Sequence, residues 1–414
     1  MTSDIARTTP PGLPAGQLRG VVAVLCATEI ISWGILFYAF PVLSTTIRDT
    51  EDWSLTWLVA CFTAAQLVAA AAGLWVGRRI DSHGPRSVMT AGSCLGVVAV
   101  VLIAAAPNLP SFLLAWLLAG VAMSGTLYAP AFAAVTGWAG DQWVKALTAV
   151  TLVAGLASTV FAPITAVLVD HVSWRTTYVC LAVVLVGTIP LHWLGLAASW
   201  TPLTGHLAGS VLHDPARRRV VHQPEFVLLV AAMTLGGFCV YAVVVNLVPL
   251  LIQHGLTTTE AAVALGIGGA GQVVGRLFYR PVLIRYSARV RTVGTLGAAS
   301  LTTLALAVVH QPVLVVCALS FAAGTARGIF TLIQATAVSD RWGTHDFGAR
   351  NGILSGAVMA AAAFAPWVGT LLASAVGGYA AAFVVLALGC LGATALVRPH
   401  DPAAEPVPAP NGPR

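Results

Sequence analysis

Long apolar runs repeat along this chain and dominate its sequence. Twelve of them are about 20 residues or longer, at 20–43, 54–77, 87–106, 111–135, 146–169, 176–197, 226–252, 259–279, 291–310, 313–337, 350–373 and 379–397. A helix of about 20 residues is about 30 Å long, which matches the hydrocarbon core of a bilayer. Helices satisfy their backbone hydrogen bonds within lipid, and the alternating pattern of a membrane β-barrel is absent. The runs therefore predict an all-α polytopic membrane protein with twelve transmembrane helices.

Composition excludes the main soluble classes of protein. Of the 414 residues, 58% are hydrophobic and 9% are charged, whereas a soluble domain has about 25% charged residues. A soluble enzyme, a disordered chain and a nucleic-acid-binding protein are excluded, despite the net charge of +6. The seven cysteines lie in separate apolar runs without a CxxC motif or a Cys/His cluster. We therefore expect no metal site, disulfide or cofactor.

The basic residues are distributed asymmetrically between the loops. With the N-terminus placed in the cytoplasm, 17 of the 21 basic residues fall on the cytoplasmic side and only Arg48 and Arg175 fall outside. The remaining two, Arg276 and Arg327, lie within spans. Positively charged loops stay on the cytoplasmic side of a membrane. This asymmetry predicts a multi-pass protein of the cytoplasmic (inner or plasma) membrane with both termini inside.

One long loop divides the spans into two groups of six. It carries the run Arg217-Arg218-Arg219 and little apolar periodicity, which is typical of a solvated cytoplasmic linker; contact with anionic lipid is the alternative. The predicted organisation is a cytoplasmic N-terminal segment (1–19), an N-terminal six-helix bundle (20–197), the linker (198–225), a C-terminal six-helix bundle (226–397) and a cytoplasmic tail (398–414).

Short matches between the halves support an internal repeat. Three pairs keep nearly one spacing: 77–78 with 275–276, 125–128 with 324–327, and 161–163 with 364–366, at offsets of 198, 199 and 203 residues. They pair span two with eight, four with ten, and five with eleven. Parallel repeats of six helices are typical of one transporter architecture, which carries its binding site at the repeat interface.

The loop between spans two and three carries a recognisable motif. It reads Gly-Arg-Arg-Ile-Asp-Ser-His-Gly-Pro-Arg over residues 77–86 and resembles the signature loop of the major facilitator superfamily. The matching positions are Gly77, Asp81, Gly84 and Arg86. The resemblance implies a secondary transporter of two bundles that works by alternating access. It also implies that Asp81 forms part of a cytoplasmic gate and contacts span eleven in the outward-facing state.

Three ionisable residues lie within the apolar spans. Glu29 is the only acidic residue deep in a span, about 15 Å past Arg19 along a helix. Burial in a medium of low dielectric constant favours the neutral carboxylic acid, which is the property that a proton-coupling group needs. Arg276 and Arg327 remain charged and offer planar donors to a carboxylate or phosphate. A structural role for Glu29, and extension of Arg276 to the membrane interface, remain the alternatives.

Helical spacing adds polar residues to these charges. Gln272 precedes Arg276 by four positions, and Thr331 and Gln334 follow Arg327 at four and seven, so each set shares a face. We predict a substrate site composed of Arg276, Arg327, Gln272, Tyr128, Asn246, Trp33 and Gln334, with Gln66 as a further polar residue facing the same cavity. Hydrogen bonding between helices is the alternative for the amides, and packing is the alternative for Trp33.

A narrower resemblance concerns span eight. Arg276, four residues after Gln272, looks like the span-eight arginine of the monocarboxylate and oxalate–formate porter branch, which meets the substrate carboxylate. Monocarboxylate members often carry an aspartate where this chain has Gln272, so Glu29 would have to couple the proton. The stretch from Glu29 to Gly34 also loosely resembles the first span of that branch.

Together these features predict a transporter of a small, monocarboxylate-like organic anion, coupled to protons. Its expected partners are the solute, protons and membrane lipid, and we expect a monomer. One alternative is proton-coupled efflux of amphipathic or toxic compounds, although the glycine-rich pattern of drug antiporters in span five is faint. Another is a transporter-derived sensor that binds solute without net flux. An enzyme is not expected because no catalytic constellation is apparent.

Overall fold

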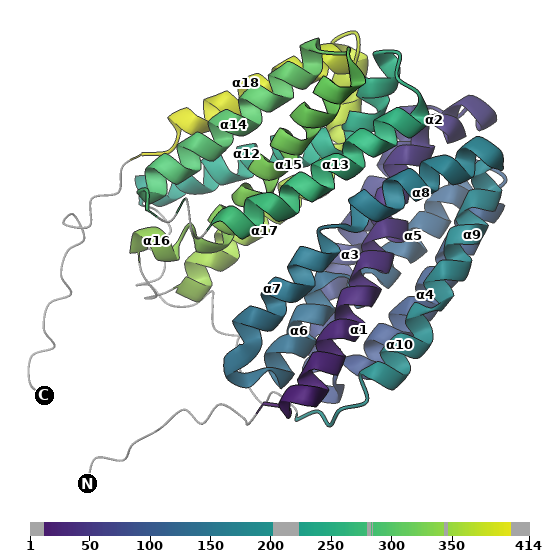
Figure 1. The fold of residues 1–414 in the computed structure, drawn as a ribbon, viewed down its shortest axis with the longest axis vertical. Helices are drawn as coiled ribbons and strands as arrows, with labels where there is room; N and C mark the ends of the chain where they lie inside the picture. Colours follow the sequence, from purple (N-terminus) through teal and green to yellow (C-terminus); the bar gives the residue numbers. More distant parts are fainter. Residues whose placement is uncertain (1–11, 202–222, 280–282, 284, 343–346, 399–414) are drawn as a thin grey trace, which may run out of the picture.

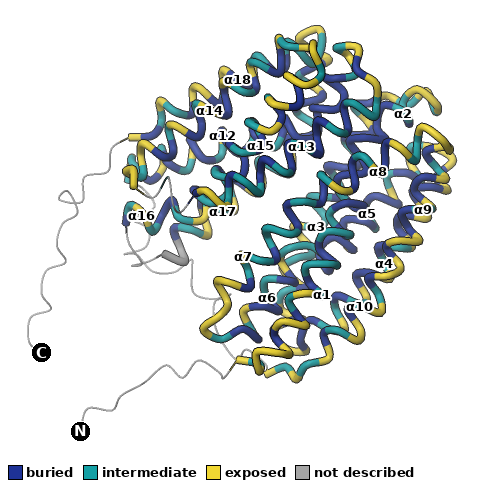
Figure 2. The backbone as a smooth tube through the Cα atoms, in the orientation of Figure 1, coloured by how far each residue is buried: buried dark blue, intermediate teal, exposed yellow. Residues whose placement is uncertain are grey.

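The computed structural model describes residues 12–201, 223–279, 283, 285–342 and 347–398. Most of the predicted linker and the predicted tail beyond residue 398 lie outside these residues. The described chain folds into two bundles of antiparallel helices, drawn in purple to teal and in teal to yellow (Figure 1). Each bundle contains a core of buried apolar side chains, and exposed residues lie mainly on the outer faces (Figure 2).

The N-terminal bundle comprises six passages, several of which are interrupted. Its elements are α1 (Ala15–Trp33), η1 (Gly34–Tyr38), α2 (Ala39–Glu51), α3 (Leu55–His83), α4 (Pro85–Ala105), α5 (Leu109–Thr126), α6 (Tyr128–Trp138), η2 (Gly140–Gln142), α7 (Trp143–Ala154), α8 (Ala157–His171), α9 (Trp174–Val186) and α10 (Thr188–Gly195).

The C-terminal bundle repeats this arrangement with longer uninterrupted helices. Its elements are α12 (Pro224–Gln253), α13 (Thr258–Phe278), α14 (Ala288–Val308), α15 (Val313–Thr336), α16 (Ser339–Trp342), α17 (Phe347–Ala375) and α18 (Tyr379–Ala395). In each bundle, the first helix begins and the last helix ends on the same side of the molecule. We call this the termini side, and the other the opposite side.

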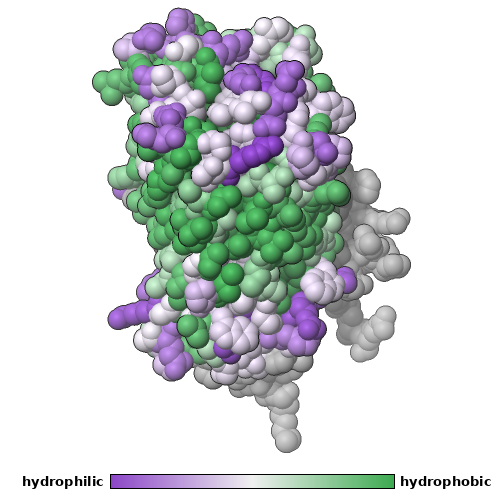
Figure 3. All heavy atoms as spheres, turned by 90° about the vertical axis from the view of Figure 1, so that its right-hand side faces the viewer, coloured by the Kyte–Doolittle hydropathy of each residue, from purple (hydrophilic) through white to green (hydrophobic). Residues whose placement is uncertain are grey.

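The predicted membrane architecture is confirmed. Among the described residues, eleven helical passages are long and apolar enough to cross a membrane, and α18 is a shorter apolar helix of 17 residues. On the face shown in Figure 3, hydrophobic residues form a belt across the middle, with hydrophilic residues above and below it. This distribution fits a body surrounded by lipid.

The two bundles meet on the opposite side and diverge toward the termini side (Figure 1). Helix α8 packs against α13, and α17 packs against α3. Since the repeat equates span five with eleven and span two with eight, these two contacts are equivalent. Hydrogen bonds join the halves here: Thr259 donates to the Asp170 carboxylate, and Thr159 Oγ1 donates to the Gly266 carbonyl at 2.8 Å.

Candidate functional site

A cavity of about 340 Å³ lies between the two bundles. Helices α1, α3, α5, α6 and α7 with η1 line it from the N-terminal half, and α12, α13, α15 and α17 line it from the C-terminal half. Its polar and aromatic lining residues are Trp33, Phe37, Tyr38, Gln66, Ser124, Tyr128, Tyr241, Gln272, Arg276, Arg327 and Thr331. Ligand pockets commonly measure about 300–1,000 Å³.

Irregular backbone in the N-terminal half lies at this cavity. The π-helical turn η1 carries Phe37 and Tyr38 into the lining, and such turns are frequent at functional sites. Leu127 breaks the fourth passage with extended backbone. Pro130 then occupies the first turn of α6, where its missing N–H group costs no helical hydrogen bond. The break exposes Tyr128 at the cavity wall.

Arg327 brings a buried positive charge to the cavity. Only 8% of its surface is exposed, and its Nε donates to Gln272 Oε1 at 2.7 Å. Its Nη2 has no hydrogen-bond partner within the described structure. A buried guanidinium group with an unsatisfied donor is costly, so this arrangement favours an incoming acceptor.

Arg276 reaches across the molecule rather than to the membrane interface. Its Nη1 donates to the Thr151 carbonyl of α7 at 2.7 Å, and its Nε lies 3.4 Å from Thr331 Oγ1. Tyr128 also interacts with Arg276 electrostatically. All these partners are neutral, and among the described residues no Asp or Glu lines the cavity. The lining therefore carries two positive charges without a negative one.

Close packing of α13 on α15 holds the two arginines together. A Cβ atom on Gly324 would lie 1.8 Å from the Gly268 carbonyl oxygen, and one on Gly328 would lie 2.1 Å from that of Gln272. Small residues at these crossings let helix backbones touch within a membrane. The contact brings Gln272 within hydrogen-bonding distance of Arg327.

Glu29 lies directly behind the cavity wall. It is fully buried, and its Oε2 accepts a hydrogen bond of 3.0 Å from Trp33 Nε1. Its Oε1 has no partner among the described residues. Trp33, one helical turn later, lines the cavity. The indole ring thus separates the carboxyl group from the cavity and is hydrogen-bonded to it.

An aromatic wall extends from Trp33 across the N-terminal half. The centroid of the Trp33 ring lies 4.9 Å from the centroid of the Tyr128 ring and 5.3 Å from that of the Phe37 ring. Tyr128 in turn stacks on Phe132 at 5.1 Å. The hydroxyl-bearing rings of Tyr38 and Tyr241 also line the cavity and interact electrostatically with Arg327.

The structure brings most of the predicted site residues together but not all of them. Asn246 is buried away from the cavity, where it donates to the Pro366 carbonyl and accepts from Thr370 Oγ1 at 2.8 Å. It therefore joins α12 to α17, which was the alternative for this amide. Gln334 is partly buried and is absent from the lining, because it lies two helical turns beyond Arg327.

The predicted gate loop is almost entirely helical and lies at the termini side: Gly77 and Asp81 belong to the last two turns of α3, Gly84 joins the two helices, and Arg86 lies in the first turn of α4. Gly84 has φ of 81°, a conformation that favours glycine, and a Cβ atom there would lie 2.9 Å from Trp200. Trp200 Nε1 donates to the Asp81 carbonyl at 3.1 Å. Arg86 stacks over the Trp193 ring at 4.1 Å.

The side chain of Asp81 is exposed and makes no hydrogen bond or ion pair within the part of the chain that the structure describes. The resemblance placed its contact with span eleven in the outward-facing state. Among the described residues of α17, none makes a hydrogen bond or ion pair with the Asp81 side chain, and the two bundles diverge on this side (Figure 1).

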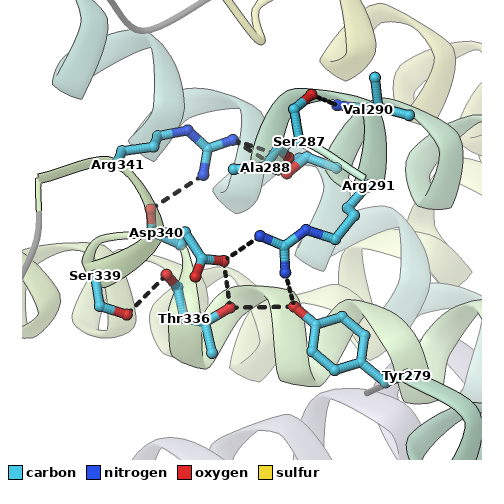
Figure 4. Close-up of polar contacts among 11 residues, drawn as sticks. Tyr279, Ser287, Ala288, Val290, Arg291, Thr336, Ser339, Asp340 and Arg341 are labelled. Carbon is cyan, nitrogen blue, oxygen red and sulfur yellow. Dashed lines mark hydrogen bonds and ion pairs between the residues drawn. The ribbon is translucent and has the colours of Figure 1, made fainter. Parts of the chain in front are cut away.

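The sequence reasoning missed a polar network at the same end of the C-terminal half (Figure 4). Arg291 donates to Asp340 Oδ2 at 2.9 Å and to the Tyr279 hydroxyl at 2.7 Å. Thr336 Oγ1 donates to the same carboxylate oxygen at 2.8 Å. The segment carries a repeat signal, since Asp340-Arg341-Trp342 matches residues 141–143, Asp-Gln-Trp, at an offset of 199. That match does not indicate the ion pair, because its counterpart Asp141 is exposed.

Sequence and structure comparisons agree with this architecture. The sequence model of the Major Facilitator Superfamily matches residues 22–319. The chain is similar to a crystal structure of a bacterial homolog to the human lysosomal transporter Spinster, in an inward-facing and unoccupied conformation. The TM-score is 0.70 at 14% identity, with 93% of this chain and 95% of that chain covered.

An inward-facing and occupied structure of such a homolog gives a TM-score of 0.67 at 13% identity, with 92% and 93% covered. No curated protein matches the sequence. At these identities the structural matches establish a shared fold.

Proposed function

The chain belongs to the major facilitator superfamily, and from that premise we propose that it carries a small organic anion across the cytoplasmic membrane together with a proton. A multi-pass membrane transporter is what the family and the fold establish. The anion and the proton coupling are our proposal. Alternating access would result from rocking of the two bundles around the cavity between them.

One observation carries the choice of an anion: two arginines line the cavity and no carboxylate among the described residues balances them. Buried charges are normally paired. A carboxylate group on the solute would supply the missing negative charge and accept from the unsatisfied Arg327 Nη2. Lipophilic cations, by the same reasoning, would be repelled.

Glu29 is the proposed proton carrier. Its carboxyl group is buried, has one oxygen without a partner among the described residues, and is hydrogen-bonded to Trp33 of the cavity lining. A neutral Glu29 avoids the cost of a buried charge, whereas the ionised form would be favoured when water reaches it. Opening to one side of the membrane would therefore change its protonation, which is how a coupling group biases a transport cycle.

The proposed orientation puts the termini side in the cytoplasm. The bundles diverge on that side (Figure 1), so this conformation would be open inward. Asp81 would then find its partner on span eleven only after the bundles close on the cytoplasmic side.

Ligand binding tests the anion site. We expect thermal stabilisation of the purified protein by organic carboxylates, and its loss in Arg276→Gln and Arg327→Gln. Arg289→Gln is the matched control, because Arg289 is exposed on α14, does not line the cavity, and donates a hydrogen bond to the Val397 carbonyl. Equal stabilisation of the wild type and both cavity variants would reject the anion site.

The apolar part of the lining supports a second candidate, efflux of amphipathic compounds. It predicts that expression confers resistance to structurally unrelated, uncharged or cationic toxins. A transporter-derived sensor would instead bind carboxylates without net flux into liposomes.

A further inference from the structure

The two sides of the cavity differ in chemistry. The C-terminal half contributes both cations, Arg276 and Arg327. The N-terminal half contributes the rings of Trp33, Phe37, Tyr38 and Tyr128, the polar side chains of Gln66 and Ser124, and small or apolar side chains. A solute in the cavity therefore meets positive charge from one half and mainly aromatic rings from the other, and Tyr128 lies close enough to Arg276 to interact with it.

The size of the cavity points to a solute with a substantial apolar body. An acid as small as lactate would reach the arginines and leave much of the 340 Å³ unfilled. The rings of Trp33 and Phe37 would then remain hydrated, although burial of apolar surface is a main source of binding free energy. An apolar group that extends from the carboxylate would cover these rings.

The geometry of the wall favours a flat ring. Trp33 packs against Tyr128 at 4.9 Å and against Phe37 at 5.3 Å, in tilted arrangements. Aromatic rings prefer offset or edge-to-face neighbours at such spacings, and these pairs contribute beyond the area that they bury. A second carboxylate on the solute would lie against these rings and lose its hydration without a basic partner.

We infer that the preferred substrate class is an aryl monocarboxylate, with its carboxylate on Arg276 and Arg327 and its ring on the wall formed by Trp33, Phe37 and Tyr128. This inference rests on the proposed function, since it uses the same site. The ring contact also reaches the proposed proton site, because Trp33 Nε1 is hydrogen-bonded to Glu29. A substrate ring packed on Trp33 would therefore restrict the motion of the indole that is hydrogen-bonded to the Glu29 carboxyl group.

The test compares dissociation constants for four ligands: benzoate, cyclohexanecarboxylate, lactate and succinate. Benzoate and cyclohexanecarboxylate match in charge and closely in size but differ in aromaticity. We expect the dissociation constant of benzoate to be lower than that of cyclohexanecarboxylate by a factor of about three or more. It should be lower than those of lactate and succinate by a factor of about ten or more. Equal affinity for benzoate and cyclohexanecarboxylate, or tighter binding of lactate or succinate, would overturn the inference.

Variants locate the preference at the wall. Trp33→Leu and Phe37→Leu should each reduce the benzoate-to-lactate affinity ratio severalfold, whereas Trp57→Leu should not, because Trp57 is 61% exposed on the outer surface of α3. A ratio is insensitive to the fraction of protein that is folded, and two independent variants guard against a folding defect in one. An unchanged ratio in both would place the ring elsewhere and reject the inference.

The two proposals fail in different ways. Binding of lactate or succinate in preference to benzoate, abolished by Arg327→Gln, would reject the aryl preference and leave the anion site intact. Absence of binding for every carboxylate would reject the proposed function itself.

Discussion

At the scale of single residues, the important feature is how buried charge is balanced. Arg291 on α14 is buried, with 8% of its side chain exposed, and the Asp340 carboxylate is its ion-pair partner. Arg327 is equally buried and has only an amide, Gln272 Oε1, as its hydrogen-bond acceptor among the described residues. Each guanidinium group keeps one nitrogen without a partner among the described residues, but only the first has a carboxylate beside it. The carboxylate separates a structural cation from a candidate binding cation.

Asp340→Asn should destabilise the C-terminal half. The substitution removes the only anion that the described structure gives to Arg291, and hydrogen bonds to charged groups contribute about 1.5–3 kcal/mol. We expect a lower melting temperature of the purified protein with unchanged carboxylate affinity. Asp141→Asn is the control, because Asp141 is the repeat counterpart and is exposed. Equal melting temperatures for the two variants would contradict the structural role of this ion pair.

Ion pairs of this kind could not be predicted from the sequence. The apolar spans and the positive-inside pattern placed Arg291 and Asp340 near the termini side, but pairing depends on how α14 and α15 pack. The same limit applies to Asn246, whose position in span seven allowed either a cavity or a helix contact. By contrast, Glu29, Arg276 and Arg327 could be selected because a charge within an apolar run is rare whatever the packing.

At the scale of elements, glycine sets the distance between the helices that carry the arginines. Helices α13 and α15 touch through Gly268, Gly271 and Gly275 on one side and Gly324 and Gly328 on the other. The sequence predicted both helices within a few residues. It did not predict the closeness of their contact, since glycine is frequent elsewhere in the chain, as at Gly297, where a Cβ atom would meet nothing within 4 Å.

Gly324→Ala should separate α13 from α15. A Cβ atom 1.8 Å from a backbone oxygen cannot be accommodated without a shift of the helix, and overpacking costs about 1–3 kcal/mol. We expect a lower melting temperature and weaker carboxylate binding, since the Gln272–Arg327 bond crosses this contact. Gly297→Ala on α14 should instead be neutral or stabilising by about 0.5–1 kcal/mol. Similar effects of both substitutions would contradict this account of the packing.

At the scale of the whole molecule, the two bundles meet on the opposite side and are separated from each other on the termini side. The sequence established the number of spans and the repeat, and hence which helices are equivalent. It gave no information on the conformation, because both states of an alternating-access cycle are encoded by one chain. In the observed state, hydrogen bonds from Thr259 to Asp170 and from Thr159 to Gly266 join the halves on the opposite side.

Loss of the bond between Thr259 and Asp170 should shift this equilibrium. In a cysteine-free background, spin labels at Ser54 and His310 report the separation of the halves on the opposite side, where both residues are exposed. We expect Asp170→Asn combined with Thr259→Val to increase the long-distance population. Thr176→Val, which removes a bond within one half, should leave the distribution unchanged. No change in the double variant would mean that this bond does not stabilise closure.

Coupling of protons to the transport of an organic anion is the role that we propose for Glu29. The most direct measurement is uptake of a labelled aryl carboxylate into proteoliposomes under an imposed pH gradient, alongside counterflow exchange without one. Protein-free liposomes provide the baseline, because protonated weak acids cross lipid unaided. We expect the wild type to show both activities, and Glu29→Gln to lose gradient-driven uptake but retain exchange. Gradient-driven uptake at the wild-type rate in Glu29→Gln would contradict this role.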